Sequence, residues 1–166
     1  MKILIVDTSR PFPELLANEI AKRLKDKGKI PADHVLSWGD MFDNKDSYIG
    51  FMGDYHGVIE SIIKNFNDLE VIVMDSMMTI PRDIDGDSTT ASLQILRDLV
   101  EVHGFDANEL YAKATLVEAF QPTDGYDDLR PKGLDDEVWE AFCKRIVLKL
   151  GIDYGEFAEK IVYRAL

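Results

Sequence analysis

The sequence predicts one α/β domain in which a parallel β-sheet is covered by helices on both faces. Short, fully apolar runs alternate along the chain with amphipathic stretches of helical period. Two of these apolar runs end at an aspartate, and no linker, repeat or low-complexity tract interrupts the 166 residues. Strands that alternate with helices imply crossover connections, and such connections produce parallel sheets that are buried on both sides.

The first half of the chain contains two clear strands and two clear helices. Residues 3–6 and 71–74 are short apolar runs, and each is followed by an aspartate. A helix is predicted between Pro11 and Gly28, and a second one at residues 58–66, because their apolar residues recur at spacings of three and four. Residues 34–38 form a weaker candidate for a strand between these two helices.

The second half repeats the alternation. The pattern predicts a helix, a strand and two further helices, in the order 93–100, 115–120, 138–150 and 154–165. We place the domain at residues 1–150 and expect residues 151–166 to be a helical extension packed on it. The apolar stripe of this last helix must be buried, either on its own domain or against a second copy, so a homodimer through this helix is a hypothesis.

The composition excludes several classes of partner. With 19 basic and 31 acidic residues the formal net charge is −12, which disfavours binding to nucleic acid or to anionic membranes and favours divalent cations and basic partner surfaces. The lone Cys143 cannot form an internal disulfide. The N-terminal apolar run is far shorter than a membrane span of about 20 residues. We therefore expect a cytoplasmic protein.

Three acidic residues are expected at one edge of the sheet. Asp7 and Asp75 end apolar strands, and Glu118 lies in the strand predicted at 115–120. Ligands gather at the carboxyl ends of parallel strands, where neighbouring carboxylates need a cation or a proton to relieve their repulsion. Mg²⁺ meets this need with one or two carboxylates and several waters. The alternative is that both aspartates are only turn formers or helix caps.

Three stretches of the chain resemble the CheY-like receiver domain of two-component response regulators. They are residues 2–7 (KILIVD), 58–78 (VIESIIKNFNDLEVIVMDSMM) and 126–132 (YDDLRPK). The resemblance covers roughly residues 1–150 and implies a flavodoxin-like, doubly wound sheet in three α/β/α layers. It also implies a signalling or interaction module whose protein partner is a histidine kinase or a phosphotransfer protein.

The resemblance assigns roles to individual residues. Asp75 would accept the phosphoryl group, and Mg²⁺ would be held by Asp75, by Asp7 and by the backbone carbonyl of Met77. Lys132 would pair with the acyl phosphate, and Glu118 would stand where receivers carry a switch hydroxyl. The module therefore either takes a phosphoryl group on Asp75 or acts without phosphorylation.

Several features depart from the receiver pattern. Thr8 replaces the second acid after the first strand, and Glu118 would repel an acyl phosphate. The order Pro131-Lys132 is reversed relative to receivers, and too few residues separate the fourth strand from the stretch that resembles the fifth to form a helix. Two long loops, 39–55 and 79–90, are expected near the active edge.

The alternative function is a small Mg²⁺-dependent enzyme that acts on a nucleotide or a phosphate ester. In that case Asp7 and Asp75 would act together with Asp83, Asp85 or Glu118 as metal ligands or as a general base. The long loops would then serve as substrate lids.

Overall fold

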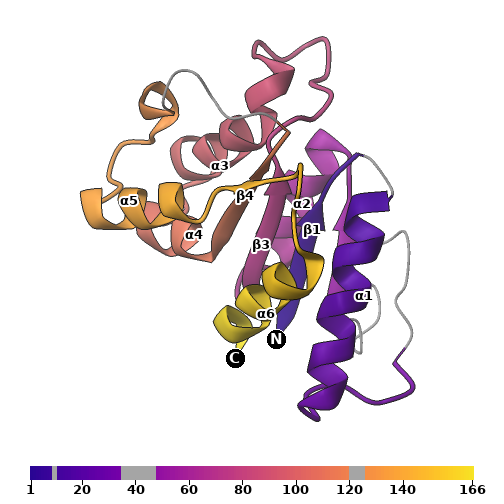
Figure 1. Ribbon diagram of the computed structural model, residues 1–166. Helices are drawn as coiled ribbons and strands as arrows, with labels where there is room; N and C mark the ends of the chain where they lie inside the picture. Colours follow the sequence, from indigo (N-terminus) through magenta and orange to yellow (C-terminus); the bar gives the residue numbers. More distant parts are fainter. Residues whose placement is uncertain (9–10, 35–47, 120–125) are drawn as a thin grey trace.

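The computed structural model describes residues 1–8, 11–34, 48–119 and 126–166. In these residues five parallel strands form one sheet in the order β2-β1-β3-β4-β5 (Figure 1). The strands are β1 (Lys2–Val6), β2 (Ile49–Met52), β3 (Leu69–Asp75), β4 (Ala114–Glu118) and β5 (Val147–Leu148). This is the doubly wound order of flavodoxin and CheY, so the predicted fold class is confirmed.

Helices cover both faces of the sheet (Figure 1). One face is covered by α1 (Pro11–Asp26) and α6 (Tyr154–Ala165). The other is covered by α2 (Tyr55–Asn65), α3 (Ala91–Glu101), α4 (Ala107–Lys113) and α5 (Asp136–Lys144). No helix in the described ranges is long and apolar enough to cross a membrane.

Alternate residues of the central strands fill the two apolar cores. Ile3 and Ile5 of β1 belong to the core under α1 and α6, whereas Leu4 and Val6 belong to the core under the other helices. Each of these four side chains is at most 1% exposed. A strand buried on both sides must be apolar at every position, which is why β1 and β3 were recognisable from sequence.

Aspartates define where three of the helices begin. The side chains of Asp54, Asp106 and Asp153 each accept a hydrogen bond from the backbone N–H three residues later, at 2.8 to 2.9 Å. These bonds satisfy N–H groups that the first helical turn leaves without a partner. Part of the acidic excess therefore caps helices.

Strand β2 was not predicted from the sequence. Apart from His34, the residues of the expected strand 34–38 lie outside the described residues, while β2 lies within the stretch 39–55 that was expected to be a loop. It pairs with β1 in the register Ile3↔Ile49 to Val6↔Met52. A four-residue strand that contains a glycine gives almost no periodic signal, which explains the error.

The helix predicted at 138–150 is also wrong in its second half. Helix α5 ends at Lys144, and residues 147–148 instead form β5 at the edge of the sheet. Apolar residues at 146, 147 and 150 continue the helical spacing, so the pattern hid the strand. The sequence had predicted a fifth strand too close to the fourth to leave space for a helix between them. Because β5 lies further along the chain, α5 is that helix.

The C-terminal helix is an integral part of one helical layer. Its stripe of Phe157, Ala158, Ile161, Val162 and Ala165 is buried in the core that it shares with α1. Ion pairs from Glu159 to Arg23 (3.1 Å) and to Lys27 (3.6 Å) join α6 to α1 and to the residue that follows it. The apolar stripe on which the dimer hypothesis was based is thus covered within a single chain.

Candidate functional site

Asp7 and Asp75 lie next to each other at the carboxyl edge of the sheet. Strands β1 and β3 are neighbours in the register Val6↔Met74, so the residue that follows each of these positions is an aspartate. Asp7 is 8% exposed and Asp75 is 6% exposed. Two carboxylates this close and this buried need a nearby positive charge.

Lys149 supplies that charge. Its Nζ lies 2.8 Å from Oδ2 of Asp7 and also forms an ion pair and a hydrogen bond with Oδ2 of Asp75. The same ammonium lies 4.7 Å from the ring centre of Phe12, while the N–H of Met77 donates to Oδ1 of Asp75 at 2.9 Å. A single cationic group therefore holds both aspartates together.

The protonation equilibria of the pair follow from burial and contact. Burial raises the pKa of Asp75, and the negative charge of Asp7 adds to this effect, while the bonds from Lys149 and Met77 oppose it. Burial acts against the charged form of Lys149, but its bonds to the two aspartates outweigh it and raise the pKa of Lys149. The lysine is therefore fully charged at neutral pH.

Glu118 forms a second network beside Asp75. It ends β4, which pairs with β3 in the register Asp75↔Val117. Its Oε2 accepts a hydrogen bond from the Ser76 hydroxyl at 2.6 Å, and its Oε1 accepts one from the Tyr126 hydroxyl. Burial, and secondarily the charge of Asp75, raise the pKa of Glu118, whereas the Ser76 bond opposes this shift.

The structure thus brings Asp7, Asp75 and Glu118 to one edge of the sheet, as the strand ends indicated. Lys132 makes no ion pair with these acids within the described residues; it is exposed in the turn that precedes α5. The lysine at the aspartate pair is Lys149, which the sequence analysis placed in a helix. The only signal for it was a polar residue directly after Val147 and Leu148.

Close backbone packing also shapes this edge. A Cβ atom added to Gly53, in the turn between β2 and α2, would lie 2.8 Å from the backbone oxygen of Asp7. The turn therefore approaches the aspartate more closely than any other residue type would allow. The contacts of Gly53 with Asp7 and of Tyr126 with Glu118 were not predicted, because the chain makes them only after folding.

The loop at 79–90 folds back onto the start of α3. The N–H of Met78 donates to the backbone oxygen of Ser88 at 3.0 Å, and the side chain of Gln94 donates to the backbone oxygen of Asp85 at 2.7 Å. Asp83 and Asp85 are exposed. Among the described residues, no three His, Cys, Asp or Glu side chains are grouped so that they could hold a metal ion.

Comparison with known proteins gives one structural similarity. No protein-family model matches the sequence, and no curated protein matches it. Among solved structures the chain is similar to the receiver (REC) domain of RcsB from Salmonella enterica serovar Typhimurium, determined in the presence of the phosphomimetic BeF3−. The sequences are 15% identical, the similarity covers 100% of this chain and 98% of that one, and the TM-score is 0.39. The strand order of the sheet itself is the flavodoxin-like order, which CheY shares.

Proposed function

We propose that this chain is a receiver-like signalling module that accepts a phosphoryl group on Asp75. The observation that carries the proposal is the buried aspartate pair with Lys149 bound between its members. The donor would be a histidine kinase or a phosphotransfer protein, and the output would be a contact with another protein. A net charge of −12 agrees with an output that does not involve nucleic acid.

The geometry supports a specific division of labour for this reaction. Oδ2 of Asp75 would attack phosphorus and form the new P–O bond, while the bond to the donor nitrogen breaks and the donor leaves. The N–H of Met77 fixes the other oxygen, Oδ1, and so orients the carboxylate. Lys149 already contacts Oδ2 and would transfer its ion pair to the phosphoryl oxygens.

The aspartate pair also fits a divalent cation. Both carboxylates reach one Nζ atom, so their oxygens converge closely enough to share a single cation. Asp7, Asp75 and the carbonyl of Met77 would hold Mg²⁺, which supplies neutralisation of the charge that develops on the transferred group. Lys149 would first have to leave Asp7, and its partly exposed side chain gives it room to do so.

The position of Glu118 supports a second candidate function, a module that signals without phosphorylation. Its carboxylate is bound by two hydroxyl groups next to Asp75, so it adds negative charge close to the place that a phosphoryl group would take. The enzyme alternative has less support. Asp83 and Asp85 are exposed in a loop, which leaves Asp7, Asp75 and Glu118 as the acids for catalysis.

Beryllofluoride with Mg²⁺ tests the proposal directly. We expect the amide resonances of Asp75, Met77 and Lys149 to shift in the wild-type chain and to stay unchanged in Asp75→Asn. If Glu118 is the obstacle, only Glu118→Gln will respond, and the phosphorylation-independent module is then the better description. No response in either chain would end the phosphoryl-acceptor proposal. Turnover of phosphate esters that Asp75→Asn abolishes would favour the enzyme instead.

A further inference from the structure

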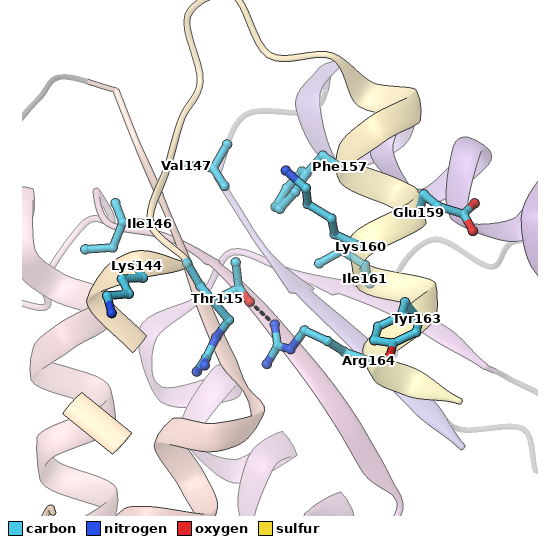
Figure 2. A pocket seen from close by; sticks show the side chains of 11 residues that line it. Thr115, Lys144, Ile146, Val147, Phe157, Glu159, Lys160, Ile161, Tyr163 and Arg164 are labelled. Carbon is cyan, nitrogen blue, oxygen red and sulfur yellow. Dashed lines mark hydrogen bonds between the residues drawn. The ribbon is translucent and has the colours of Figure 1, made fainter. Parts of the chain in front are cut away.

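A cavity of about 610 Å³ lies beside the edge strand β5, between it and α6 (Figure 2). Its apolar wall includes Ile146, Val147, Phe157 and Ile161. Four basic residues also line it, namely Lys144, Arg145, Lys160 and Arg164. None of the residues of the aspartate site contributes to this lining.

The cavity exists because β5 is so short. It pairs with β4 only at Val117↔Val147 and Glu118↔Leu148, so the first part of β4 pairs with β3 on one side and has no strand beside it on the other among the described residues. Two guanidinium groups take that place. Arg145 donates to the backbone oxygens of Tyr111 (2.6 Å) and Ala114 (3.1 Å).

Arg164 reaches the same edge from α6. It donates to the backbone oxygen of Ala112 at 2.8 Å and to the hydroxyl of Thr115, a bond that is visible in Figure 2. A guanidinium group carries five N–H donors, and on both arginines some of them have no acceptor among the residues that the structure describes. The arginines are thus held rigidly while they retain unused donors.

The two guanidinium groups have no carboxylate partner in the described part of the chain. Burial and then the charge of Arg145 lower the pKa of Arg164 to about 10, and burial lowers the pKa of Arg145. The acid at the rim, Glu159, pairs instead with Arg23 of α1 and with Lys27, the residue that follows α1. Partly buried charges are normally paired, so these two cations would be well matched by an anionic ligand.

We propose that this cavity binds a small organic anion whose phosphate or carboxylate group lies between Arg145 and Arg164. Its apolar part would rest against Val147, Phe157 and Ile161. The volume falls within the range of about 300 to 1,000 Å³ that is usual for small-molecule sites. The proposal is independent of phosphoryl transfer to Asp75.

Phenyl phosphate is a suitable probe because it combines an anionic head with an apolar ring. We expect saturable shifts of the amide resonances of Thr115, Val147 and Ile161 in the full chain, with a Kd of about 1 mM or lower. Inorganic phosphate alone and phenol alone should each bind more weakly, since each supplies half of the contacts. Benzoate shows whether the cavity prefers a carboxylate to a phosphate.

Two variants and a matched control assign the binding to this cavity. Arg164→Lys keeps the charge but loses the planar fork, so we expect roughly tenfold weaker binding of phenyl phosphate. The side chain of Lys144 makes no hydrogen bond or ion pair within the described structure. Lys144→Gln should therefore weaken the binding of phenyl phosphate a fewfold. Lys22→Gln removes the same charge from an exposed position on α1 and should change nothing.

Three results would overturn the proposal. The first is the absence of saturable shifts with phenyl phosphate, and the second is an equal loss of affinity in Lys22→Gln and Lys144→Gln, which would mean attraction to general charge. The third is binding of hexaglutamate, but not of phenyl phosphate, at the same amides, because the cavity would then belong to an interface with an acidic protein. The Lys144 comparison still decides if Arg164→Lys does not fold.

Discussion

Replacing Lys149 with methionine should destabilise the chain by about 3 kcal/mol at pH 7. The substitution keeps most of the apolar stem of the side chain and removes the ammonium that contacts both Asp7 and Asp75. Breaking a buried ion pair by removing one partner costs about 3 to 5 kcal/mol. The lower end applies because the side chain of Lys149 is 23% exposed, so water can replace part of the lost interaction.

The loss should depend on pH in a definite direction. Two neighbouring carboxylates without a cation repel each other by about 3 to 4 kcal/mol at an effective dielectric constant of about 20, so one of them takes up a proton. Its pKa in the folded variant is then raised above the unfolded value. A carboxyl group whose pKa is higher in the folded than in the unfolded protein stabilises the fold fully at pH values below its pKa in the unfolded state. This stabilisation is lost as the pH rises through its pKa in the folded state. The variant should therefore approach the wild type in stability at pH 5 and fall behind it at pH 7.

Denaturant unfolding at both pH values measures this difference. Adding Asp7→Asn to Lys149→Met should restore part of the stability, because it removes one of the repelling charges. Mg²⁺ should stabilise Lys149→Met more than the wild type, since a bound ligand adds stability by mass action. Lys160→Met is the control, because that lysine is 68% exposed and its ion pair in the described structure is with the exposed Glu156. A loss below about 1 kcal/mol at pH 7, or an equal loss at both pH values, would refute the reasoning.

Three further predictions concern the same elements. Gly53→Ala should lower the free energy of unfolding by about 1 to 3 kcal/mol, because the new Cβ would lie 2.8 Å from the backbone oxygen of Asp7. Glu118→Gln should gain stability relative to the wild type as the pH rises above 4.5 in denaturant titrations, since the raised pKa of Glu118 stabilises the native state only while the carboxyl is protonated. Asp153→Ala should cost about 1 kcal/mol through the lost helix cap, and Asp135→Ala should cost less because its side chain makes no cap bond; thermal unfolding compares the two.

The sequence predicted those parts of the fold that are determined by burial. Strands β1 and β3 are apolar at nearly every position because both of their faces are covered, and that pattern is visible without any tertiary information. The edge strands β2 and β5 have four and two residues and carry no such pattern. A two-residue strand can be recognised only from its pairing with a neighbouring strand.

The same distinction applies to the candidate site. Asp7, Asp75 and Glu118 were recognised because Asp7 directly follows β1, while Asp75 and Glu118 end β3 and β4. Lys149 was missed because its position depends on β5, and the stretch that resembled a fifth strand led to Lys132 instead. The resemblance implied a lysine at this edge, and Lys149 lies there because β5 pairs with β4.

The short β5 links the aspartate site and the cavity to one structural cause. A longer strand would pair with residues 114–116 of β4 and would occupy the backbone oxygen of Ala114 that Arg145 now binds, while Arg164 covers the same edge through the hydroxyl of Thr115. Open sheet edges invite pairing with other chains, and charged side chains are a common protection against it. The two arginines provide that protection, and the space left by the missing strand residues becomes a basic cavity in an acidic protein. The two residues of β5 still place Lys149, whose N–H donates to the backbone oxygen of Glu118 at 2.8 Å and whose ammonium then reaches the aspartate pair.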